Sequence, residues 1–199
     1  MKASVHQVEL GDIESVRTLF EAARAEYGAV HTIAHAAGSA IAQPFISRVT
    51  PEQWREVIEA DVHGFFNVVH ASLPLLREHG GSYVFLSSAG LERYPAGDIL
   101  SVAPKAAIEA LIRGIAREEG RYGVRANSVA IGVVDAGMFP RLVRDGHLTQ
   151  AWIDAARRNI ALQRFGTEQE VADAVAFLAS KRASYITGQR LLLDGGYSI

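Results

Sequence analysis

The fold of this chain is decided by residues 83–130, which read YVFLSSAGLERYPAGDILSVAPKAAIEALIRGIAREEGRYGVRANSVA. The stretch opens on a short apolar run, Tyr83–Ser87, which is typical of a buried strand. Apolar side chains then recur at helical spacing over Ala103–Tyr122, and a second short apolar run follows at Arg125–Ala130. A strand, a helix and a strand in this order predict a βαβ unit whose two strands lie parallel.

The same alternation extends toward the N-terminus. A first strand is predicted at Val5–Leu10, followed by a helix that Asp12 caps and that runs to about Tyr27. The next apolar run predicts a strand at Thr32–Ala36. Pro51 stands at the first position of a further helix, which leads into a long apolar helix.

Toward the C-terminus the pattern predicts an irregular segment with short helices over residues 135–160. A last helix is predicted at Val171–Ala179 and a final strand at Arg190–Asp194. Five strands and about six helices in alternation predict one doubly wound α/β domain over residues 1–199.

Composition narrows the class of protein. The chain has 199 residues, is 49% hydrophobic and 21% charged, and carries a net charge of −2, which argues against nucleic-acid and polybasic membrane partners. It has no cysteine, so disulfides and thiolate chemistry are excluded. The N-terminus lacks the apolar core of a signal peptide and no apolar run approaches membrane-spanning length, so a cytoplasmic protein is expected.

Five stretches of the chain carry a family resemblance, namely Gly123–Val129, Leu162–Thr167, Glu170–Ala172, Tyr185–Gln189 and Asp194–Tyr197. They resemble the short-chain dehydrogenase/reductase family, in its β-ketoacyl-(acyl carrier protein) reductase and enoyl reductase branches. The resemblance implies a Rossmann-like sheet with strand order 3-2-1-4-5-6, with NAD or NADP bound where strands 1 and 4 diverge.

One family element has no counterpart among the 199 residues, namely the first βαβα unit with its TGxxxGxG phosphate loop. By resemblance Val5–Leu10 matches the family's third strand, so an N-terminally truncated fold is expected. Losing two or three charge-assisted hydrogen bonds to the pyrophosphate weakens binding by about 3–5 kcal/mol, or about 10²–10³-fold. One hypothesis is that the missing unit is encoded in frame upstream of Met1.

The resemblance implies a serine that polarises a carbonyl, a tyrosine that moves the proton and a lysine that lowers the tyrosine pKa. Ser88 matches the serine and Lys105 the lysine, but the tyrosine position four residues before Lys105 holds Ser101. The position that enoyl reductases use, seven before the lysine, holds Asp98. Tyr94 is the nearest phenol. Each of these residues also has a structural alternative: a turn residue for Ser88, a solvated charge for Lys105 and a loop residue for Tyr94. For Ser101 the alternative is a helix cap, and it is the favoured one.

Asp61 stands where the family has a relay asparagine. Some dienoyl-CoA reductases of the family lack the tyrosine and carry an aspartate in this helix, so Asp61 is a candidate general acid. The alternative, which we favour, is a carboxylate satisfied by a helix or loop N–H. For the cofactor the resemblance implies contacts from Gly38, Gly132 and Val134, with Lys105 on the ribose, and no metal.

Residues Met138–Ala161 correspond to the family's substrate lid. Their apolar side chains suit an acyl-type substrate, although the same stripe also suits a core or a subunit interface. These side chains belong to Phe139, Leu142, Leu148, Trp152 and Ile153, whereas Arg141, Arg144 and His147 are expected to be solvated.

Three functions are compatible with the sequence. The first is an NAD(P)-dependent oxidoreductase that reduces the carbonyl or enoyl group of an acyl-type substrate. The second is a non-catalytic relative, a scaffold or a partner subunit, because four site motifs are altered. In either case the resemblance implies a homo-oligomer, a dimer or tetramer, built through helices at about Pro51–Arg77 and Ala103–Tyr122 and the terminal strand. The third is a binding protein for an acyl ligand.

Overall fold

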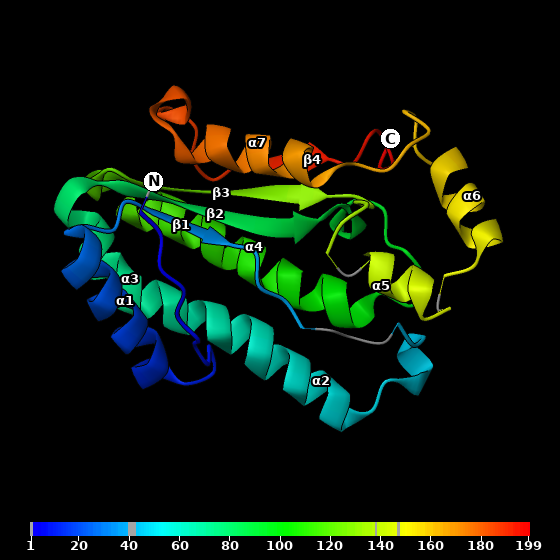
Figure 1. Ribbon diagram of the computed structural model, residues 1–199, viewed down its shortest axis with the longest axis horizontal. Coiled ribbons are helices and arrows are strands. Elements are labelled where there is room, and N and C mark those ends of the chain that lie inside the picture. The colour runs from blue at the N-terminus through cyan, green and yellow to red at the C-terminus, as the bar shows by residue number, and fades with distance from the viewer. Residues whose placement is uncertain (1, 40–42, 138, 147) are drawn as a thin grey trace.

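The computed structural model describes residues 2–39, 43–137, 139–146 and 148–199. Its centre is a parallel sheet of four strands in the order β1-β2-β3-β4 (Figure 1). The strands are β1 Thr32–His35, β2 Gly81–Ser88, β3 Val124–Ile131 and β4 Arg190–Leu193. The predicted βαβ unit is confirmed, since β2 and β3 pair in parallel along their whole length.

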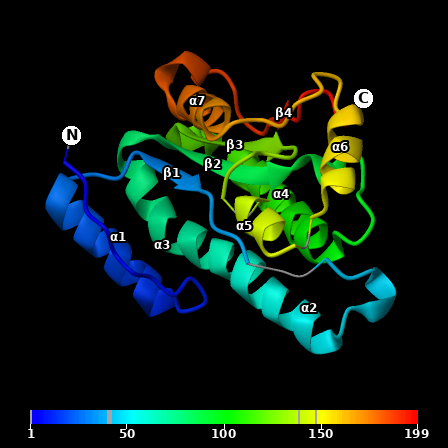
Figure 2. The same cartoon turned by 45° about the vertical axis from the view of Figure 1, so that its right-hand side comes forward.

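Helices cover both faces of the sheet, which confirms the doubly wound α/β prediction (Figures 1 and 2). One face carries α1 Ile13–Tyr27, α2 Pro51–Val57, α3 Gly64–His79 and α4 Ile99–Glu119. The other carries α7 Glu168–Ala179. The short helices α5 Phe139–Arg144 and α6 Gln150–Arg158 lie beyond the carboxyl ends of the strands, where the sequence predicts an irregular segment.

The predicted strand Val5–Leu10 is wrong: this stretch is irregular, and Val5 is 99% exposed. The segment lies near β1, since Val8 and Leu10 line one pocket with His35, but it forms no strand pairing with β1. A strand needs a hydrogen-bonded neighbour, and no described residue supplies one here. Helix α3 holds the segment instead, because Nδ2 of Asn67 donates a hydrogen bond to the carbonyl of Leu10 at 2.9 Å.

The main core lies between the sheet and helices α3 and α4. Phe65 of α3 is fully buried and packs against Phe85 of β2, with ring centroids 5.5 Å apart. Ile108 and Ile112 of α4 are buried in the same cluster. This packing fixes α4 against β2 and β3, and with it the position of every side chain at the start of α4.

Among the described residues, no helix combines the length and the apolar character needed to cross a lipid bilayer.

Neighbouring phenylalanines on α3 offer a matched test of this core. Phe65 is 0% exposed and Phe66 is 51% exposed. We expect Phe65→Ala to lower the free energy of unfolding by about 3–5 kcal/mol, because it leaves a cavity in a close-packed interior. Phe66→Ala should lower the free energy of unfolding far less. Urea unfolding followed by circular dichroism measures both, and equal losses would contradict the packing described.

Candidate functional site

The candidate site lies at the carboxyl ends of the strands, between the loops after β1 and β2 and the first turns of α4. Crevices at this edge are where open α/β sheets bind their ligands. Helix α4 begins at Ile99, four residues before the predicted start, with Asp98 as the N-cap. Asp98, Ser101 and Lys105 are spaced three and four residues apart, so they share one face of the helix.

The structure brings two of the predicted residues, Ser101 and Lys105, into contact. Nζ of Lys105 donates a hydrogen bond to Oγ of Ser101 at 3.1 Å, and both side chains are half-buried. The favoured prediction for Ser101, a helix cap, is wrong. Pro104 suggested a helix start close by, but it stands in the helix interior and Ser101 is the third helical residue.

Ser88 ends β2 beside the start of α4. Its Oγ accepts a hydrogen bond from the backbone N–H of Gly90 at 3.0 Å, which closes the short turn Ala89–Leu91. Gly90 has no room for a side chain: a Cβ there would lie 2.9 Å from Cγ2 of Val102 on α4 and 3.0 Å from Oγ of Ser88. The loop after β2 therefore packs directly on α4, with the Ser88 hydroxyl facing the same packed region.

Sequence reasoning misses Asp98, because the resemblance identifies this position only as one where a tyrosine is absent. The residue is 9% exposed, and Nε2 of Gln43 donates a hydrogen bond to its Oδ1 at 3.3 Å. Burial raises the pKa of the Asp98 carboxyl, against smaller opposing effects from Gln43 and Lys105. An aspartate after the turn Pro95–Gly97 and before Ile99-Leu100 is a helix-start signal that could have revealed its place.

Tyr94 lies in the loop between the turn Ala89–Leu91 and α4. Its side chain is 51% exposed and makes no hydrogen bond with another described residue. The alternative of a surface loop residue describes it better than a phenol turned into the site.

Asp61 lies in a π-helical segment, Ile58–His63, that joins α2 to α3. Its Oδ1 accepts hydrogen bonds from the backbone N–H of Ser39 at 3.0 Å and from Oγ of Ser39 at 2.8 Å. The alternative of a carboxylate satisfied by a loop N–H is thus confirmed. No described contact joins Asp61 to Lys105 or Ser88.

A pocket of about 200 Å³ opens beside Asp61. His35 of β1 lies at its inner side, and burial lowers the pKa of the imidazole to about 4, with Asp61 opposing the shift. The ring is therefore neutral at pH 7, and it packs edge-on against Phe65. The pocket is lined by Val8, Glu9, Leu10, His35, Ala37, Gly38, Ser39, Ala60 and Asp61.

The three predicted cofactor contacts differ in what surrounds them. Gly38 is exposed, and a Cβ there would meet no atom within 4 Å, so a ligand can approach its backbone. At Gly132 a Cβ would lie 2.9 Å from Cα of Asp194, so the chain itself requires this glycine. Val134 lies opposite Gly166 in a parallel bridge, whose hydrogen bonds are made by the N–H of Asp135 and the C=O of Val133. The N–H and C=O of Val134 itself form no hydrogen bond with another described backbone group.

These residues fit the two ends of a nicotinamide dinucleotide. The pocket beside His35 is smaller than the roughly 300–1,000 Å³ of a whole ligand site, so it suits one ring system. Lys105 suits the other end, as do the peptide groups of Val134, which bond no other described backbone group. The 199 residues contain no glycine-rich loop for the pyrophosphate between them.

The predicted lid divides between core and surface. Phe139 and Ile153 pack with Ile160 and Phe165 in a separate apolar cluster, which agrees with the core alternative. Trp152 is 42% exposed, whereas Leu142 and Leu148 are half-buried. Arg144 is exposed, and Met138 and His147 lie outside the described residues, as does the side chain of Arg141.

Residues 1–198 match the family described as enoyl-(acyl carrier protein) reductase. The chain belongs to the short-chain dehydrogenase/reductase family. It is 32% identical to a 3-oxoacyl-(acyl carrier protein) reductase of Chlamydia muridarum over 197 residues, 98% of this chain and 76% of that protein. The enzyme of the same name from Staphylococcus aureus is 31% identical over 195 residues, 96% of this chain and 75% of that protein. The chain thus spans about three quarters of the length of these relatives.

Solved structures of the family share the fold. A short-chain type dehydrogenase/reductase from Mycobacterium ulcerans has a TM-score of 0.90 at 25% identity, over 97% of this chain and 69% of that one. A tyrosine-to-phenylalanine variant of ElxO with NADPH bound has a TM-score of 0.89 at 24% identity, over 98% of this chain and 77% of that one. The second likeness establishes the fold alone.

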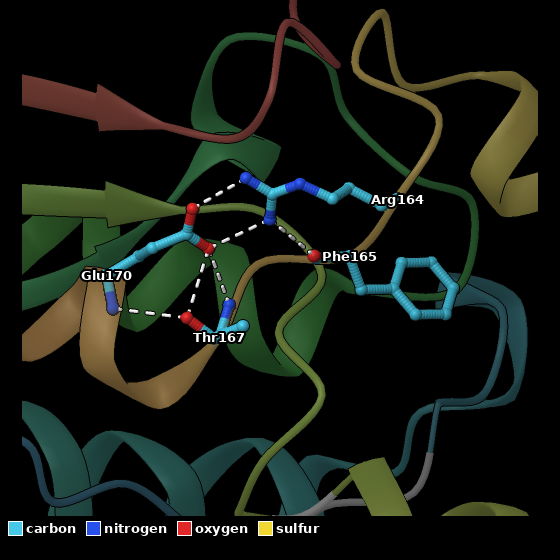
Figure 3. Close-up of polar contacts among 4 residues, drawn as sticks. All are labelled: Arg164, Phe165, Thr167 and Glu170. Atoms are coloured by element: carbon cyan, nitrogen blue, oxygen red, sulfur yellow. Dashed lines mark hydrogen bonds and ion pairs between the residues drawn. The ribbon is translucent and has the colours of Figure 1, made fainter.

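In this short-chain dehydrogenase/reductase the segment that bridges to Val134 is held by a polar network at the start of α7 (Figure 3). Thr167 caps the helix and exchanges hydrogen bonds with Glu170 in a capping box. The Arg164 guanidinium donates to both carboxylate oxygens of Glu170, at 2.6 and 3.0 Å. Gly166 lies between these residues, so the network fixes the strand-like contact that orients the Val134 peptide groups.

The network predicts a pH-dependent contribution to stability. The Arg164 guanidinium, with the backbone N–H of Thr167, lowers the pKa of Glu170 from 4.5 to about 2. Because the folded-state pKa is depressed, the stabilisation is complete above the ordinary glutamate value and is lost as pH falls toward about 2. We expect Glu170→Gln to lower the melting temperature at pH 7 and to have less effect at pH 3. Glu168→Gln, in the same first turn, is the control. A loss of melting temperature in Glu170→Gln that is as large at pH 3 as at pH 7 would contradict a stabilising role of the ionised Glu170 carboxylate.

Proposed function

We propose that this protein reduces the carbonyl or enoyl group of an acyl-type substrate with NADH or NADPH. The observation that carries the proposal is the contact between Lys105 and Ser101, which holds the ammonium group of Lys105 half-buried at the carboxyl end of the sheet. A positive charge kept at this edge of the sheet would stabilise negative charge that develops on a substrate oxygen.

Three groups of this chain would hold the cofactor, which supplies hydride when bound. The pocket beside His35 and Gly38 receives the adenosine end, where the neutral imidazole offers a flat, weakly polar wall. Lys105 would donate to the ribose hydroxyls, and the N–H and C=O of Val134, which bond no other described backbone group, would pair with the carboxamide. These contacts orient the two ends without the pyrophosphate donors of a glycine-rich loop.

Where the substrate reacts, its carbonyl oxygen needs a hydrogen bond from a donor of the protein. The Ser88 oxygen accepts from the Gly90 N–H, so its own O–H remains available to donate. Hydrogen bonds from Ser88 and the Lys105 charge would polarise a carbonyl in this position. The substrate class is supported by the names of the two curated relatives, which are reductases of 3-oxoacyl groups on acyl carrier protein.

We further propose that the chain forms a homo-oligomer. Leu191 and Leu192 of the edge strand β4 are 40% and 41% exposed, and Phe66 of α3 is half-exposed. These apolar side chains lie on two of the elements that the resemblance assigns to assembly. The alternative function, a non-catalytic subunit of such an oligomer, is favoured by one observation, the serine that stands in place of the tyrosine.

Turnover tests the proposal directly. The chain is mixed with NADPH and an acetoacetyl thioester, and oxidation of NADPH is followed by absorbance; the assay is repeated with NADH and with a crotonyl thioester. We expect measurable oxidation that Lys105→Ala lowers by about 10²-fold or more, because the oxyanion and the ribose both lose their cation. Lys181→Ala, at an exposed lysine, should leave the rate unchanged.

Two results would contradict the proposal. One is the absence of oxidation above background with every pairing of cofactor and substrate, in a chain whose circular dichroism shows it to be folded. The other is an equal rate in Lys105→Ala and the unsubstituted chain. The first result would favour the non-catalytic subunit.

A further inference from the structure

We infer that the Asp98 carboxyl group is the proton donor of this site, a role that rests on the proposed reductase function. Asp98, Ser101 and Lys105 lie on one face of α4, and Lys105 contacts Ser101 there. A carboxyl, a hydroxyl and an ammonium group therefore follow one another along the first two turns of α4.

The first argument is the direction of the Asp98 side chain. An aspartate at an N-cap ordinarily accepts a hydrogen bond from an N–H of the first helical turn. The Asp98 side chain makes no such bond, and it is the backbone carbonyl of Asp98 that accepts from Ser101 at 3.1 Å and from Val102 at 2.9 Å. The carboxyl group is therefore free of the helix end, and its described partner is the amide of Gln43 in the loop after β1.

The second argument is the protonation state. The N-terminus of a long helix and the Lys105 ammonium both favour the ionised carboxyl, and the Gln43 amide adds to this. Burial outweighs them and raises the pKa of Asp98. Among the described residues, Lys105 is the charged group that acts on Asp98. A carboxyl group that gains a proton more readily than an ordinary aspartate is suited to act as a general acid.

Three other hydroxyl and carboxyl side chains that the sequence marks out are less suited to this role. The Ser101 hydroxyl ionises far above the phenol value of about 10, so it is a much weaker acid than a carboxyl group. The Asp61 carboxylate accepts two hydrogen bonds from Ser39 and belongs to the pocket beside His35. Tyr94 is half-exposed in the loop before α4.

Reduction of a carbonyl adds a hydride to carbon, which a reduced nicotinamide supplies, and a proton to oxygen. The O–H bond of Asp98 breaks as the new O–H bond of the alcohol forms, and Asp98 is left as a carboxylate beside the Lys105 ammonium. A proton from solvent water then restores the carboxyl group.

A purely structural role for Asp98 would be to hold Gln43 through their hydrogen bond. Asp98→Asn separates the two roles, because the asparagine oxygen still accepts from Gln43 while its amide cannot supply the proton. Gln43→Ala is the matched control, since it removes the hydrogen bond and keeps the carboxyl group.

The experiment combines turnover, cofactor binding and carboxyl titration. We expect Asp98→Asn to lower kcat by about 10²–10⁴-fold, the usual loss for a positioned general acid, with the NADPH Kd and the melting temperature little changed. Asp98→Glu should recover part of the rate. In the unsubstituted chain the rate should fall as pH rises through the pKa of Asp98, and carbon-13 spectra should show one aspartate carboxyl titrating above the usual range that is missing in Asp98→Asn.

The outcomes separate this inference from the proposed function. Full turnover in Asp98→Asn, together with loss in Lys105→Ala, would overturn the role of Asp98 and leave the reductase function intact. Loss of turnover in Gln43→Ala equal to that in Asp98→Asn would reduce Asp98 to a positioning residue. An Asp98 carboxyl that titrates in the ordinary range would overturn the inference by itself, and an inactive unsubstituted chain would overturn both proposals.

Discussion

The site depends on the packing of one helix against two parallel strands. Ile108, Ile112 and Ile115 bury one face of α4 against β2 and β3, in the cluster that also contains Phe85. Close packing of this kind leaves the helix little freedom to turn or slide. The first turns of α4 are thereby held at the carboxyl edge of the sheet, and Asp98, Ser101 and Lys105 keep their order on one face.

The sequence predicted the βαβ unit of residues 83–130 well, because strand, helix and strand each leave a local pattern. Prediction from the sequence failed where a residue's structure depends on residues that are distant in the chain or absent from it. Val5–Leu10 has a strand's composition but no neighbouring strand among the described residues, so it stays irregular. Ser101 was assigned as a cap because proline usually stands near a helix start, whereas Pro104 is buried inside the helix. The burial of Asp98 depends on the fold around it, and no local pattern records that.

The candidate site contains two separate polar centres. Asp61 and Ser39 are hydrogen-bonded to each other beside a small pocket that His35 also lines, and the neutral imidazole and the bonded carboxylate suit binding rather than proton transfer. Asp98, Ser101 and Lys105 form the second centre, in which a carboxyl group with a raised pKa lies on the same helix as an ammonium group. Burial sets the protonation of both, since it keeps His35 neutral and favours the protonated form of Asp98.

Calorimetric titration of the folded chain with NADPH and NADH tests most directly whether this crevice is a cofactor site. The account predicts saturable binding of at least one of them at a single site with a Kd below about 1 mM, weaker than a complete family member because pyrophosphate donors are missing. Binding should weaken when Lys105 is replaced by alanine. No heat of binding up to millimolar concentrations of either cofactor, in a chain that circular dichroism shows to be folded, would contradict it.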